Sequence, residues 1–227
     1  MKKGYNILLQ AYFYTFITMN FLAHAFLSFN EPGILTGNMI NDYVKGKKKF
    51  DYPAAIQKGM VLHRAIDEFT DQHAVTRQAK QFFKADYRLY AGAFVDVLYD
   101  HFLANDTKEF SKEGELNSFC QLTYASLQTD FDLMPQKFQQ IFPHMQQHNW
   151  LYHYRYKEGI EKSFGGLARR AAYLSESAIA FSIFNEQYDA LQICYNEFFP
   201  QLKQFAFYTF NELNNHWIFY ICNQTLI

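Results

Sequence analysis

The chain has 227 residues, of which 49% are apolar and 19% aromatic, and its formal net charge is −1. This length suits a single domain, and so much apolar material supports a large core and excludes a disordered chain. Ten glycines and five prolines are too few for a turn-rich β sandwich, and a net charge near zero identifies no class of partner.

The N-terminal region is uncharged from residue 4 to residue 30. Such a stretch could be a signal peptide, with Ala23-His24-Ala25 as the cleavage site, or a membrane helix. Polar side chains such as Asn20 interrupt it, so we expect neither secretion nor stable membrane insertion. A third interpretation is that Met19 is the biological start and that residues 1–18 form an N-terminal extension.

Helical periodicity dominates the rest of the chain, and alternating β patterns are scarce. We therefore predict an all-α fold, built as a single-domain helical bundle. We expect a break at Ser163-Phe164-Gly165-Gly166-Leu167, because paired glycines weaken helices. The predicted helices span residues 21–27, 35–44, 54–70, 74–83, 90–103, 110–133, 135–156, 167–184 and 185–213.

The helix over residues 54–70 carries the strongest chemical pattern. His63, Asp67 and Asp71 are spaced four apart, so they share one helix face. One imidazole and two carboxylates can hold a divalent metal or a water that attacks phosphate. Asn38 and Asp42 have the same spacing on the preceding helix. On spacing alone, an amphipathic helix with a solvated polar face explains the pattern equally well.

A second polar pattern interrupts the apolar segment at residues 90–103. Asp96 and Asp100 share a face, and burying two unpaired carboxylates is costly, so they must meet cations or a metal. The adjacent pair Asp100-His101 is typical of two ligands, or of a carboxylate that orients a ligand. His24 stands alone on an apolar helix, where a histidine is more often part of the core than a ligand.

Several motifs in series resemble one known family, the acyl carrier protein phosphodiesterases, also called holo-ACP hydrolases. The resemblance runs from Met19 to about Leu202, with Asn149 standing where the family usually has Asp. The motifs are Met19-Asn20-Phe21-Leu22-Ala23-His24-Ala25, Gly37-Asn38-Met39-Ile40-Asn41-Asp42-Tyr43-Val44-Lys45-Gly46, Leu62-His63-Arg64, Ile66-Asp67, Phe69-Thr70-Asp71, Val95-Asp96-Val97, Asp100-His101-Phe102-Leu103-Ala104 and Phe198-Phe199-Pro200.

This resemblance implies an all-α fold related to the His-Asp metal phosphohydrolases, although the adjacent pair is reversed here as Asp100-His101. It implies a phosphodiesterase domain over residues 19–213, between the extension at 1–18 and a C-terminal tail at 214–227. The implied reaction hydrolyses the phosphodiester of holo-acyl carrier protein (holo-ACP), releases 4′-phosphopantetheine and leaves apo-ACP. The implied cofactor is Mn²⁺ or Mg²⁺.

We therefore predict one divalent site made of oxygen and imidazole ligands, which suit Mn²⁺ or Mg²⁺; no thiolate set is present. The predicted metal ligands are His24, Asp42, His63, Asp67, Asp100 and His101, and all of these except His24 are also predicted to be catalytic. The predicted substrate-binding residues are Asn38, Lys45, Arg64, Asp71, His73 and Arg77.

Basic residues crowd the first half of the chain, especially at Lys47, Lys48 and Lys49. A basic surface can steer an acidic partner such as ACP even when the total charge is near zero, and we expect no nucleic-acid partner. Three widely spaced cysteines indicate a reducing cytoplasm. Two alternatives stay open: a metal phosphohydrolase acting on a small phosphoester or nucleotide, and a non-enzymatic helical binding protein.

Overall fold

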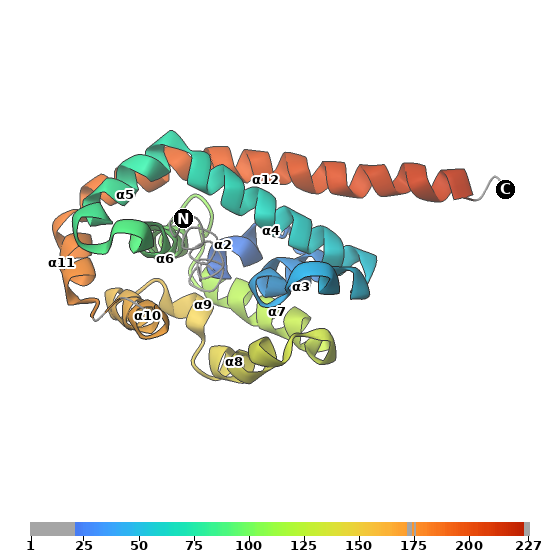
Figure 1. The fold of residues 1–227 in the computed structure, drawn as a ribbon, viewed down its shortest axis with the longest axis horizontal. Helices are drawn as coiled ribbons and strands as arrows, with labels where there is room; N and C mark the ends of the chain where they lie inside the picture. The colour runs from blue at the N-terminus through green and yellow to red at the C-terminus, as the bar shows by residue number, and fades with distance from the viewer. Residues whose placement is uncertain (1–20, 172–173, 175, 225–227) are drawn as a thin grey trace, which may run out of the picture.

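The computed structural model describes residues 21–171, 174 and 176–224, and this part of the chain is all-helical (Figure 1). None of these described residues lies in a β-strand, which confirms the predicted all-α class. The α-helices are α2 (Phe21–Phe26), α3 (Pro32–Ile40), α4 (Ala54–Gln72), α5 (Ala74–Tyr87), α6 (Ala91–Ala104), α7 (Glu115–Thr129), α8 (Gln136–Gln147), α9 (Trp150–His153), α10 (Lys157–Arg170), α11 (Ala178–Glu186) and α12 (Tyr188–Gln224). Short 3-10 helices lie at η1 (Asn41–Tyr43), η2 (Gly46–Asp51), η3 (Arg88–Tyr90) and η4 (Phe131–Leu133).

Two glycines let α3 and α4 cross with their backbones in contact. A Cβ atom on Gly37 would overlap the backbone of Ile56, and one on Gly59 would overlap the carbonyl of Ile34. Only glycine allows such an approach. The crossing places the C-terminal end of α3, with Asn38, beside the middle of α4, with His63.

Helix α6 forms the buried centre of the bundle, because all of its residues except Gly92 are buried. Its Asp100 is fully buried, and its two carboxylate oxygens accept the backbone N–H groups of Leu22 (3.0 Å) and Ala23 (2.8 Å). These bonds satisfy donors that the first turn of α2 would otherwise leave unpaired. Asp100 therefore fixes the short helix α2 against α6.

The predicted break at residues 163–167 is wrong, since α10 continues from Lys157 to Arg170. Ile160, Phe164 and Leu167 lie on one face of α10 and are almost completely buried. Burial of that stripe outweighs the cost of two helical glycines, which is about 1 kcal/mol each.

The predicted helices over residues 110–133 and 135–156 are shorter than expected. Helix α7 ends at Thr129, and α8 ends before Asn149, which has a left-handed backbone with φ 44° and ψ 54°. Left-handed residues terminate α-helices, and asparagine tolerates this conformation better than most residues. The chain therefore turns at Asn149 into the separate short helix α9.

The last helix, α12, is longer than the predicted segment at residues 185–213. It passes Leu213 without a break and continues to Gln224, projecting away from the other helices (Figure 1). The boundary predicted at residue 213 therefore coincides with no helix end, and the predicted extension at residues 1–18 lies outside the described residues. Over the described residues, no helix combines enough length with enough apolar character to span a membrane.

The crossing of α3 and α4 yields a stability prediction. Gly59→Ala should lower the free energy of unfolding by about 2 kcal/mol or more, because the added methyl group overlaps the backbone of α3. Urea denaturation followed by circular dichroism measures this change. The control is Gly165→Ala, whose Cβ would lie 3.4 Å from the mobile end of Arg169 and should cost nothing. Equal stability of Gly59→Ala and the wild type would contradict the packing argument.

Candidate active site

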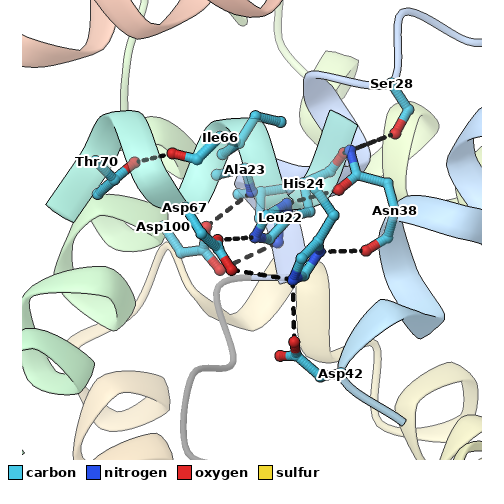
Figure 2. A network of polar contacts seen from close by, with 11 residues as sticks. Leu22, Ala23, His24, Ser28, Asn38, Asp42, Ile66, Asp67, Thr70 and Asp100 are labelled. Carbon is cyan, nitrogen blue, oxygen red and sulfur yellow. Dashed lines mark hydrogen bonds and ion pairs between the residues drawn. The ribbon is translucent and has the colours of Figure 1, made fainter. Parts of the chain in front are cut away.

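Asn38 orients two histidines that come from different helices. Its side-chain oxygen is 2.7 Å from Nδ1 of His24, and its backbone oxygen is 2.7 Å from Nδ1 of His63. Its amide nitrogen donates to the carbonyl of His24 and to the hydroxyl of Ser28, which fixes the orientation of the amide (Figure 2). Because both partners of the rings are acceptors, each Nδ1 carries a proton and donates it. The two rings stack with their centroids 4.0 Å apart.

The opposite nitrogens of both rings face carboxylates. Nε2 of His63 lies 3.1 Å from Asp42 Oδ1 and 3.1 Å from Asp67 Oδ2, and Nε2 of His24 lies 3.2 Å from Asp67 Oδ1. One ligand atom from each of His24, His63 and Asp67 fits within a mutual distance of 4.8 Å. The structure thus brings together four of the six predicted metal ligands.

The cluster holds a proton in the absence of a cation. Burial lowers the pKa of His63, but the carboxylates of Asp67 and Asp42 outweigh burial and raise it to about 10. Burial raises the pKa of Asp67, but the neighbouring His63 and His24 hold it well below its usual range. The metal-free site is therefore an ion pair of a cationic His63 and an anionic Asp67.

The donor set fits a divalent cation. Nε2 of His24 is buried, and its nearest polar neighbour is the Asp67 carboxylate, 3.2 Å away, so this nitrogen is available as a ligand. Each imidazole has its Nδ1 proton anchored by a carbonyl-type oxygen, as metal-ligating histidines usually do. Carboxylate and imidazole donors without a thiolate suit Mn²⁺ or Mg²⁺.

The cluster opens into a cavity of about 550 Å³ between α4, α5 and the start of α6. Asp42 and Asp67, which contact His63, line this cavity, and cations from α5 and η3 form a further part of its wall. Lys80 of this wall makes an ion pair with Asp71, with 2.7 Å between Nζ and Oδ1. The charged lining residues are Asp42, Asp67, Asp71, Asp96, Arg77, Lys80, Lys84 and Arg88.

Asp96 is the site residue that the predicted ligand set omits. It lines the cavity together with Asp42 and Asp67, and only 8% of its surface is exposed. Burial raises its pKa to about 8; Lys80 opposes the rise, and nearby carboxylates add to it. The sequence does contain a signal for Asp96, because a carboxylate within an apolar helix needs a partner. The same signal applies to Asp100, so it does not separate the two residues.

The two remaining predicted ligands have structural contacts instead. Both oxygens of Asp100 accept backbone N–H groups of α2, and burial raises its pKa well above the usual value. His101 lies outside the cluster: its Nδ1 donates to the carbonyl of Tyr154 at 2.7 Å, and its Nε2 lies 3.1 Å from the hydroxyl of Tyr188. Its predicted convergence with His63 is therefore wrong, because both of its ring nitrogens are engaged by Tyr154 and Tyr188.

Of the predicted substrate-binding residues, some line the cavity and others do not. Asp71 and Arg77 line the cavity, whereas Arg64 and Lys45 are exposed and are not among its lining residues. His73 caps α5 by accepting the N–H of Val75. Asn38 acts through the two histidines.

Comparisons with known proteins identify the family of this chain. The family model for acyl carrier protein phosphodiesterase matches residues 19–202, which include the whole histidine–aspartate cluster. The chain belongs to this family. Relatives named acyl carrier protein phosphodiesterase are 30% identical, over 188 residues in Klebsiella pneumoniae subsp. pneumoniae and in Yersinia pestis, and over 184 in Salmonella agona. The alignments cover 81–83% of this chain and 95–97% of each relative. No solved structure matches the chain.

The ion pair of the metal-free cluster predicts pH-dependent metal binding. A cation must displace the proton of His63, so affinity should rise with pH while this proton is present, which is below about pH 10. We expect the apparent dissociation constant of Mn²⁺ to fall by about tenfold per pH unit between pH 6 and 8. Calorimetry in buffers of different ionisation enthalpy should detect the released proton. Equal affinity at pH 6 and pH 8 would contradict this assignment.

The buried carboxyl of Asp96 predicts opposite effects of Asp96→Asn on the stability of the metal-free protein and on its stabilisation by Mn²⁺. An acid whose folded pKa is about 8 destabilises the fold progressively as pH rises from about 4 to 8. Asp96→Asn should therefore be more stable than the metal-free wild type at pH 8, by more than about 1 kcal/mol, and nearly equal at pH 4. Saturating Mn²⁺ should raise the melting temperature of the wild type more than that of the variant. A variant less stable than the metal-free wild type at pH 8 would refute the burial argument.

Proposed function

We propose that the chain hydrolyses the phosphodiester of holo-ACP, releasing 4′-phosphopantetheine and leaving apo-ACP. The single observation that carries the proposal is the cavity in which the histidine–aspartate cluster faces a wall of four cations. That cavity offers both a cation site and a phosphate site, and the chain belongs to a family whose curated members are named for this activity.

We propose that the cluster holds Mn²⁺ or Mg²⁺, with His24, His63, Asp67 and Asp42 as the residues that would hold it and Asp96 beside them. A divalent ion there would lower the pKa of the attacking water and offset charge on the phosphoryl oxygens. In this proposal Asn38 keeps both Nε2 atoms aimed at one point, so the site is organised before the ion binds. Histidines and aspartates on successive helices also support a relation to the His-Asp metal phosphohydrolases.

The cationic wall would bind the phosphodiester. Arg77 and Lys80 would neutralise the non-bridging oxygens, which carry more charge as water adds to phosphorus. The bond from phosphorus to the serine oxygen of the carrier breaks, and that oxygen takes a proton to become the hydroxyl of apo-ACP. The phosphate stays on the pantetheine product.

The same wall also suits an acidic carrier protein. Lys84 and Arg88 lie at the cavity and are exposed, so they can contact carboxylates at the edge of the site. Such contacts raise association rates more than affinity, and salt weakens them. The lysines of η2 at residues 47–49 remain a second predicted docking surface. We also propose a cytoplasmic location, which fits the free thiols of Cys120 and Cys194.

The proposal is tested by incubating holo-ACP with the protein and Mn²⁺ and then measuring the intact mass of the carrier. The wild type should convert holo-ACP to apo-ACP, and His63→Gln should reduce the rate at least about 100-fold, because it removes a nitrogen ligand. The matched control is His144→Gln, at an exposed position of α8 that does not line the cavity, and it should stay within about threefold of the wild type.

Two results would point to the alternatives that stay open. Hydrolysis of a nucleotide or a small phosphoester, with holo-ACP unchanged, would identify a small-molecule phosphohydrolase. Binding of holo-ACP without any hydrolysis in Mn²⁺ or Mg²⁺ would identify a binding protein.

A further inference from the structure

A second cavity of about 590 Å³ lies between α6, the turn from α8 to α9, and α10. Its inner surface comes from buried or half-buried residues, including Val97, Trp150, Tyr154 and Ser163. Two cations, Lys162 and Arg169, are exposed at its rim. None of the described residues that line this cavity is acidic. Its two histidines, His148 and His153, are exposed like the two cations. The buried part of the cavity is therefore neutral, with both apolar surface and hydrogen-bonding groups.

Neighbouring positions on α6 line the two cavities. Ala93 lines the charged cavity and Val97 lines the neutral one, and residues four apart on a helix are neighbours on the same face. Asp96, at the charged cavity, directly precedes Val97 in sequence. A ligand that fills both cavities would therefore cross α6 near Asp96, beside the histidine–aspartate cluster.

A hydrogen-bonded path also joins the neutral cavity to the cluster. The Tyr154 side chain, which lines the cavity, makes a hydrogen bond to Asp100. Asp100 in turn accepts the backbone N–H groups of Leu22 and Ala23, the residues that immediately precede His24. The carboxylate of Asp100 therefore contacts both Tyr154, which lines the neutral cavity, and the backbone that immediately precedes His24.

We propose that the neutral cavity binds the pantetheine arm of the substrate, while the phosphodiester lies in the charged cavity. This inference rests on the proposed function. The phosphodiester has two substituents, and the carrier protein is folded and must stay outside the bundle. The other substituent is an uncharged chain with two amides, a hydroxyl and a dimethyl group, which suits a mostly neutral pocket with a few hydrogen-bonding groups.

The charged cavity is a poor alternative for the arm. Its lining contains four carboxylates and four cations. Desolvating these charges with an uncharged chain would be unfavourable, because none of them would gain a partner. The neutral cavity offers Asn149 and Ser163 as amide and hydroxyl groups, and Trp150 as a flat apolar surface.

Filling the neutral cavity tests this inference. Gly166 lines the cavity from α10 and is buried, so Gly166→Leu should place an isobutyl group in the path of the arm. Ser163→Leu is a second filling variant at a half-buried position, in case the first variant folds poorly. The matched control is Glu161→Leu on the same helix, because Glu161 is exposed and does not line this cavity.

Each variant is assayed with Mn²⁺ on holo-ACP and on bis(p-nitrophenyl) phosphate, a phosphodiester that has no pantetheine arm. We expect at least a tenfold loss of kcat/KM on holo-ACP in both filling variants. Hydrolysis of the small diester should stay within about threefold of the wild type. The inhibition constant of 4′-phosphopantetheine against the small diester should rise about tenfold in both filling variants, and the control should match the wild type throughout.

The outcomes separate this inference from the proposed function. If the wild type cleaves holo-ACP and a folded filling variant cleaves it within twofold, the arm binds elsewhere and the proposed function stands. If the wild type cleaves the small diester but leaves holo-ACP intact, the proposed function fails and the inference fails with it. Equal losses on both substrates would show that the filling variants disturb the catalytic site, which would also overturn the inference.

Discussion

The candidate active site depends on one asparagine. Asn38 binds the Nδ1 protons of His24 and His63 through its side chain and its backbone, respectively. Without these acceptors the two stacked rings could rotate, and their Nε2 atoms would no longer face the Asp67 carboxylate. The contact exists because Gly37 and Gly59 let α3 reach the backbone of α4. The close crossing of α3 and α4 at these glycines thus determines how His24 and His63 are oriented.

Burial divides the carboxylates of α6 between two roles. Asp96 and Asp100 are one helical turn apart, and burial raises the pKa of both. Asp100 gains two backbone donors and stabilises α2, whereas Asp96 faces a cavity in which Lys80 is the nearby cation. A buried carboxylate that has no backbone donors is costly in the metal-free protein. The carboxyl avoids that cost by keeping its proton up to about pH 8. A cation bound beside it, as proposed for this site, would offset the cost of the ionised form and link the stability of the fold to the proposed function.

The periodicity of the sequence determined the all-helical class, and four of the predicted ligands do converge. His63 and Asp67 were predictable because their spacing on one helix fixes their relative position. The paired glycines of α10 predicted a break that the structure does not have, since intrinsic helix propensity is weaker than burial of the stripe that contains Phe164. The extent of α12 was missed for a related reason: helix ends depend on contacts and caps as well as on composition.

The sequence by itself determined which residues are chemically capable, and the family motifs determined where they occur along the chain. Only the tertiary structure showed that Asp96, and neither Asp100 nor His101, faces the charged cavity. All three stand in one apolar helix whose surroundings the sequence does not specify. The decision came from segments far away in sequence: α2 supplies donors to Asp100, and Tyr154 and Tyr188 contact the His101 ring. Local spacing fixes neighbours within a helix, whereas the face that meets a cavity is fixed by how the other helices pack.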